Sequence, residues 1–163
     1  MNIIYISDFF VEQIAGGGEL VDDCLMKHLT LRGFSVSKIN ADKVDSVYLQ
    51  QNKDSFFIVS NFVNLNEPSK KILESCRYVI YEHDHKYTLG RDPSPYKDFI
   101  VPKDMLCNLS FYKNAQTVIC QSKLHAEVLQ KNIKSNNIIS AGCTLWSKEH
   151  LETLKRHLNT KKT

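Results

Sequence analysis

The chain has 163 residues, of which 42% are hydrophobic and 24% are charged, and this composition is that of an ordinary globular domain. Its length suits one domain with a sizeable buried core. No apolar run approaches the roughly 20 residues needed to span a bilayer, and the opening residues, MNIIYISDFF, lack the basic flank of a signal peptide. We therefore expect a cytoplasmic protein without a membrane span.

The five cysteines are far apart, odd in number and without a C-x-x-C pair, so we expect reduced, mostly buried thiols. The net charge of +3 comes from the end of the chain, because residues 155–163 hold four of the 21 basic residues and no acidic one. Subtracting these four leaves 17 basic residues against 18 acidic ones. The folded body has no basic excess, and we do not expect nucleic acid as a direct ligand.

Short apolar runs alternate with segments of helical periodicity along the chain. The first run, NIIYIS, is continuous and rich in Ile and Tyr, which is typical of a strand buried on both faces of a parallel sheet. Five more such runs follow, separated by helical segments or loops. The predicted strands are residues 2–7, 34–40, 55–62, 77–81, 116–121 and 137–142.

The first predicted helix extends over residues 19–32. Its apolar positions form one stripe, and we expect Asp22 and Asp23 to face away from that stripe. Gly33 should end the helix, since glycine readily adopts the left-handed conformation found there. The apolar stripe consists of Val21, Cys24, Leu25 and Leu29.

Further helical segments fill the gaps between the later strands. Ser122 and Ser147 should cap two of these helices, because a serine hydroxyl accepts a hydrogen bond from a free N–H of the first turn. The last helix aligns three leucines on one side. The remaining predicted helices are residues 41–51, 66–76, 104–114, 123–131 and 146–159.

This alternation predicts an α/β fold: a doubly wound, mostly parallel sheet of about six strands with helices on both faces, Rossmann-like in architecture. We assign residues 1–145 to this domain and residues 146–163 to a C-terminal helix or connector with a basic tail. Ligands of such sheets bind beyond the carboxyl ends of the strands, where the strand order reverses. In a 3-2-1-4 order, the first and fourth strands are neighbours, and the segments after them meet across one cleft.

The segment AGGGELV follows the first predicted strand. Gly16, Gly17 and Gly18 would let backbone N–H groups approach an anion closely, and the dipole of the helix that follows favours negative charge there. The segment matches neither the dinucleotide-binding nor the P-loop motif. It predicts a phosphate site, with a flexible loop and a plain glycine helix start as the alternative.

The segment YEHDHKY, residues 81–87, follows the fourth predicted strand. His83 lies at the strand end, where it could face a substrate hydroxyl or a leaving phosphate as a catalytic group. Asp84, His85, Lys86 and Tyr87 are candidate substrate-binding residues. No third ligand at metal spacing accompanies the two histidines, so we predict no metal site. The alternative is a charged loop that caps a helix.

Three segments together resemble retaining, nucleotide-sugar-dependent glycosyltransferases of the GT-B type. NIIYISDFF…GGGELVDDCLMKHLTLRGFSV is similar to the family's opening strand, its loop containing G-G-x-E, its long helix and the glycine before the second strand. YVIYEHDHKY resembles the fourth strand and its following histidine, and QTVICQSKLHAEVL resembles a later strand that ends in serine before a helix. The three segments occur in the family's order and cover residues 1 to about 145.

The resemblance implies the N-terminal, acceptor-side half of an enzyme built from two Rossmann-like halves, of which the C-terminal half holds the sugar nucleotide. It implies that Gly16 and Gly17 approach the donor phosphate, that Gly18 and Glu19 open the helix, and that His83 lies near the transferred sugar. It implies no metal and no cofactor apart from the nucleotide-sugar co-substrate, since protein dipoles and cations stabilise the leaving diphosphate.

The donor-binding half of that family has no counterpart in this sequence. We therefore expect a C-terminal donor-binding domain in cis or in trans, little or no sugar transfer by this chain alone, and a capacity for self-association through an exposed apolar face. Two other functions stay open. One is a stand-alone nucleotide-binding or regulatory module with a Rossmann-like core, and the other is a small metal-dependent hydrolase that uses the histidine-rich segment.

Overall fold

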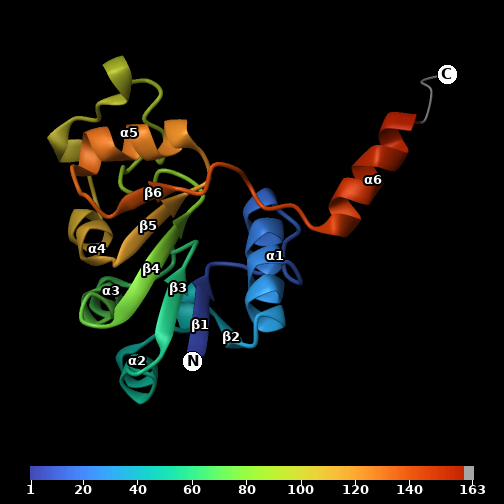
Figure 1. Ribbon diagram of the computed structural model, residues 1–163. Helices are drawn as coiled ribbons and strands as arrows, with labels where there is room; N and C mark the ends of the chain where they lie inside the picture. The colour runs from blue at the N-terminus through green and yellow to red at the C-terminus, as the bar shows by residue number, and fades with distance from the viewer. Residues whose placement is uncertain (160–163) are drawn as a thin grey trace.

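The computed structural model describes residues 1–159, which form one six-stranded sheet flanked by helices (Figure 1). All strand pairings are parallel, in the order β2-β1-β3-β4-β5-β6. This arrangement confirms the prediction of a doubly wound α/β fold. The strands are β1 (Asn2–Ser7), β2 (Ser35–Asn40), β3 (Phe56–Val59), β4 (Arg77–Glu82), β5 (Thr117–Cys120) and β6 (Ile138–Ser140).

The strand order differs from the 3-2-1-4 arrangement considered from the sequence. β3 lies between β1 and β4, with Phe56 paired to Ile3 on one side and to Arg77 on the other. The side chains explain the difference: SVSKIN in β2 is polar and has no fully buried residue, as an edge strand tolerates, whereas FFIV in β3 is almost fully buried. The order reverses between β1 and β3, so the ligand-binding edge is expected there.

The helices cover the two faces of the sheet unequally, with α1 alone on one side and α2 to α5 on the other (Figure 1). The alternation of β1 shows the division, because Ile3 and Tyr5 belong to the core under α1, and Ile4 and Ile6 to the larger core on the opposite face. The helices are α1 (Gly17–Leu31), α2 (Ser46–Gln51), α3 (Glu67–Leu73), α4 (Leu109–Asn114), α5 (Lys123–Ile133) and α6 (Lys148–Asn159).

Most of the residues predicted to begin or end a helix do so in the structure. Ser122 Oγ accepts from the backbone N–H of His125 at 3.1 Å, and Ser147 Oγ accepts from that of His150 at 3.2 Å. Gly33 has φ +86° directly after the end of α1. α1 itself begins two residues earlier than predicted, which places two of the three glycines inside its first turn.

The helix α6 extends away from the sheet at the end of the described chain (Figure 1). Its three leucines, at positions 151, 154 and 158, are exposed, and none of the helices in residues 1–159 is long and apolar enough to cross a membrane. The last four residues of the predicted basic tail lie outside the described residues. The five cysteines are free, but only Cys24 and Cys120 are buried, fewer than expected.

Candidate functional site

The glycine segment places the start of α1 at the carboxyl edge of the sheet. Gly16 is the N-cap, with an extended backbone and no side-chain cap, so the first N–H groups of this 15-residue helix have no capping side chain. A methyl group added at Gly17 would meet nothing within 4 Å, whereas one at Gly18 would lie 3.5 Å from Cγ of His83. The helix start is therefore open at Gly17 and in contact with His83 at Gly18.

The side chain of His83 is 8% exposed and is held by both ring nitrogens. Its Nε2 lies 2.7 Å from Oδ1 of Asp22 in α1, and its Nδ1 lies 2.6 Å from Nε2 of Gln121, the residue after β5. The Gln121 oxygen accepts from the Thr144 hydroxyl at 2.7 Å, which leaves the Gln121 amide nitrogen to donate to Nδ1. This pattern puts the ring proton on Nε2, facing Asp22.

Asp22 is a functional candidate that the sequence analysis placed wrongly. It was expected to face away from the apolar stripe of the first helix, but it is 1% exposed and points to the sheet. Besides His83, the hydroxyls of Tyr5 and Ser60 donate to it at 2.7 and 2.6 Å. A buried carboxylate needs such donors, and these satisfy it. The signal was present, because Asp22 precedes Leu25 by three residues and shares its side of the helix.

Two tyrosines surround this polar group on the sheet side. Burial and the nearby Asp22 carboxylate raise the pKa of Tyr5 well above its ordinary value. Burial, together with Asp22, raises the pKa of Tyr81 to about 12, and the Tyr81 ring lies edge-on to His83 with centroids 5.2 Å apart. Both phenols therefore stay protonated at neutral pH, and Tyr5 acts as a hydrogen-bond donor to Asp22.

A cavity of about 290 Å³ lies between the start of α1 and the residues that follow β4, β5 and β6. We call it the glycine crevice. Gly17 and Gly18 form one wall, and His83 and Gln121 form its polar floor. The half-exposed Trp146 and His150 close it from the far end of the chain. Trp146 and His150 reach this site because of the position of α6, which depends on the linker after β6 and has no local signal in the sequence.

No family model matches the chain, and no curated protein matches it. The glycine crevice combines open N–H groups at a helix start, an apolar wall with one indole ring, and a histidine fixed by two hydrogen bonds. These groups suit a ligand with an anionic part and a polar ring.

Of the histidine-rich segment 83–87, only His83 lines the glycine crevice. The side chain of Asp84 is 34% exposed and pairs with Lys86 and with Arg91, away from the glycines. Tyr87, expected to bind substrate, is instead fully buried in the larger core. Glu19 lies beside the helix start, where its Oε2 would be 2.3 Å from a methyl group on Gly16. A carboxylate of the chain itself thus occupies one side of this helix end.

Lys86 joins a buried group on the opposite face of β4. Its ammonium bonds to Oε1 of Glu82 at 3.1 Å and to Asp84, and the hydroxyl of Tyr112 also donates to Glu82. Burial lowers the pKa of Lys86, but the two carboxylates outweigh burial and hold it above the ordinary lysine value. Lys86 therefore carries its charge inside the fold.

His85 packs against His125 of α5, with ring centroids 4.6 Å apart. Nδ1 of His85 and Nε2 of His125 are buried without a hydrogen-bond partner. Burial is the main reason why the pKa of both rings is lowered, to about 4 for His125. Within residues 1–159, no three His, Cys, Asp or Glu side chains are grouped to share a metal ion.

Proposed function

We propose that the chain is the acceptor-side domain of a glycosyltransferase that moves a sugar from a nucleotide-sugar donor to an acceptor. A donor-binding domain, in cis or in trans, would complete the active site. The observation that carries this proposal is the shared crevice, in which the start of α1 and His83 come together across three strands of the sheet. The order of the three family-like segments supports the same conclusion.

In this proposal the open helix start receives the donor phosphate. Gly17 presents its backbone N–H on the side of the helix end that the Glu19 carboxylate leaves open, and the helix dipole favours a negative charge at this end. His83 lines the crevice next to Gly18, near the sugar and the acceptor. Because both ring nitrogens are already bonded, His83 can address a substrate only after it releases Gln121 or Asp22.

A titration followed by amide NMR tests the proposal on the chain as it stands. Nucleoside diphosphates and the corresponding nucleotide sugars are added at millimolar concentration, and the nucleosides are uridine, guanosine and adenosine. We expect at least one of them to shift the amide signals of Gly17, Gly18 and Gln121. The absence of such shifts for every ligand would contradict the binding of the donor phosphate at the helix start.

A pair of valine variants separates binding from folding. Gly17→Val fills the open space at the helix start and should remove the shifts, since a branched side chain keeps phosphate from the backbone. Gly90→Val is the matched control, because a methyl group at Gly90 also meets nothing within 4 Å but lies in a loop outside the crevice. Equal binding by both variants would remove the helix start from the site.

The strand order favours a second candidate, a stand-alone nucleotide-binding or regulatory module. The order 2-1-3-4-5 is the flavodoxin-like one, in which a mononucleotide binds where the order reverses. The same titration distinguishes the two functions. Binding that depends only on the nucleotide, with no difference between the diphosphate and its sugar derivative, would favour the module.

A further inference from the structure

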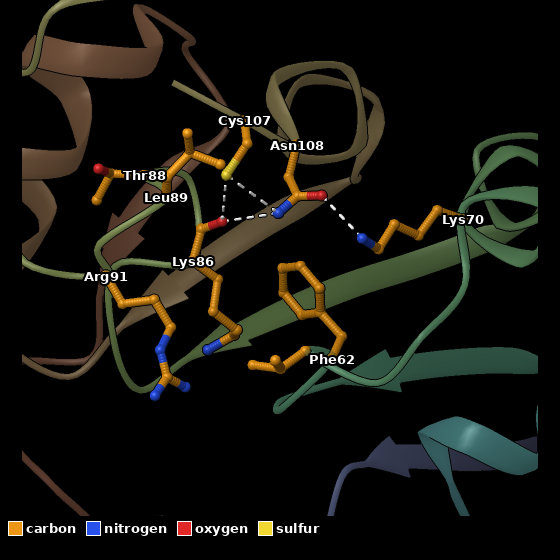
Figure 2. A pocket seen from close by; sticks show the side chains of 9 residues that line it. Phe62, Lys70, Lys86, Thr88, Leu89, Arg91, Cys107 and Asn108 are labelled. Atoms are coloured by element: carbon orange, nitrogen blue, oxygen red, sulfur yellow. Dashed lines mark hydrogen bonds between the residues drawn. The ribbon is translucent and has the colours of Figure 1, made fainter. Parts of the chain in front are cut away.

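A second cavity lies at the carboxyl edge of the sheet, on the face covered by α3 and α4. Its volume is about 150 Å³, and Figure 2 shows the side chains around it. We call it the basic pocket. It shares no lining residue with the glycine crevice. The residues that matter for its chemistry are Phe62, Lys70, Lys86, Arg91, Cys107 and Asn108.

Two of its three cations are buried. The side chain of Lys70 is 9% exposed and that of Lys86 is 2% exposed, whereas Arg91, at 53%, lies at the rim. The ring of Phe62 separates the two ammonium groups, with its centroid 5.8 Å from Nζ of Lys70 and 5.2 Å from Nζ of Lys86 (Figure 2). An apolar ring between two buried charges keeps the local dielectric low, so an anion placed there interacts strongly.

Each buried ammonium has one donor left. An ammonium carries three N–H groups. Lys70 uses two of them, on Oε1 of Glu67 at 2.7 Å and on Oδ1 of Asn108 at 2.9 Å. Lys86 likewise uses two, on Glu82 and Asp84. Buried donors are normally satisfied, so the remaining N–H of each lysine calls for an acceptor that the side chains around it do not supply.

Among the described residues, the charged side chains that line the basic pocket are all cations, and each is paired with a carboxylate outside that lining. Lys70, Lys86 and Arg91 line it, and no carboxylate does. The partner of Lys70, Glu67, is 75% exposed, so water screens its charge. Glu82 lies beneath Lys86 and also accepts from Tyr112, and Asp84 is shared between Lys86 and Arg91. The open side of the pocket therefore offers donors and no acceptor of comparable charge.

We propose that the basic pocket binds a small oxyanion, a phosphate or carboxylate group, on the Lys86 side of the Phe62 ring, with the remaining N–H of Lys86 and the guanidinium of Arg91 from the rim. The pocket holds one such group rather than a whole nucleotide, because its volume is about half that of the glycine crevice. Lys86, expected from the sequence to bind substrate, would do so here and not beside His83. The proposal does not depend on the glycosyltransferase assignment.

Titration with inorganic phosphate and with acetate, against sodium chloride at matched ionic strength, tests the proposal by amide NMR. We expect one or both oxyanions to shift the signals of Leu89, Cys107 and Asn108 at concentrations where chloride does not. Phosphate shifts at Gly17 and Gly18 would report the other site and are scored separately. No oxyanion-specific shift around the basic pocket would overturn the proposal.

Three glutamine variants assign the effect to side chains. Arg91→Gln removes a half-exposed charge and should weaken binding about tenfold, as loss of one charge-assisted hydrogen bond predicts. Lys70→Gln, on the other side of the Phe62 ring, should weaken it less. Lys71→Gln is the matched control, since the neighbouring side chain of the same helix is 63% exposed and faces Glu74. Unchanged binding in Arg91→Gln, or equal loss in all three variants, would overturn the proposal.

Discussion

Nε2 of His83 lies 2.7 Å from Oδ1 of Asp22, although 61 residues separate them in the chain. This bond ties the end of β4 to the first helix across the reversal of the strand order. It also fixes the orientation of the imidazole in the glycine crevice. The same carboxylate serves the fold and the site, so its replacement should affect both.

Asp22→Ala should lower the free energy of unfolding by about 3 kcal/mol, because Tyr5, Ser60 and His83 would lose their buried acceptor. Asp22→Asn should cost less, since the amide oxygen still accepts. Urea unfolding measures both. Asp23→Ala is the control, with a loss of less than about 1 kcal/mol expected from its surface pair with Lys27. Equal losses at positions 22 and 23 would contradict the buried network.

His83→Ala should reduce the stability by about 2 kcal/mol, since Asp22 and Gln121 each lose a partner. In the nucleotide-sugar titration it should also abolish the shift at Gly18, whose neighbour is the imidazole. His28→Ala, on the exposed side of α1, should retain that shift. A normal response of His83→Ala would leave the histidine a purely structural role.

Acid should destabilise the fold through His85 and His125. Burial lowers the pKa of both rings, to about 4 for His125, from an ordinary value of 6.5. Between these two values the unfolded chain binds more protons than the folded one, so stability is complete above pH 6.5 and is lost as the pH falls towards 4. Partial exposure of the rings limits the loss to about 2 kcal/mol.

Urea midpoints at pH 7 and pH 4.5 measure this effect. His125→Gln cannot take up the proton and should flatten the pH dependence, whereas the exposed His28→Gln should leave it unchanged. The same slope in the wild type and in His125→Gln would show that other groups cause the acid sensitivity.

Substitution of two leucines of α5, one buried and one exposed, tests how much each contributes to the free energy of unfolding. Leu129→Ala should lower the unfolding free energy by about 3 kcal/mol, because this side chain is fully buried and its removal leaves a cavity. Leu124→Ala, at a position 64% exposed on the same helix, should change it by less than about 0.5 kcal/mol. Similar losses would show that α5 does not pack as described.

The sequence predicted local structure well where a physical signal is confined to a few neighbouring residues. The apolar run of residues 2–7 is a strand with the expected bounds, and Gly33 ends α1 where the left-handed backbone requires it. The strand order could not be predicted in the same way, because it depends on which strands pair across long crossovers. The polar pattern of β2 is that of an edge strand, a signal that the 3-2-1-4 arrangement did not use.

The candidate site was predictable only in part, for a related reason. His83 and the glycines lie at strand and helix ends, where the fold class predicts ligands, and they do border one crevice. Lys86 and Tyr87 leave that crevice because successive residues after β4 turn to different faces and into the core. Gln121 and Trp146 join it through tertiary packing, for which the chain carries no local pattern.

Two walls of the glycine crevice come from segments far apart in the chain, the first turn of α1 and the segment that leads into α6. Any molecule bound there would contact both segments at once. It would add to the contacts that already hold the segment leading into α6 to the body, the Thr144–Gln121 hydrogen bond and the packing of Leu145 against the core under α1.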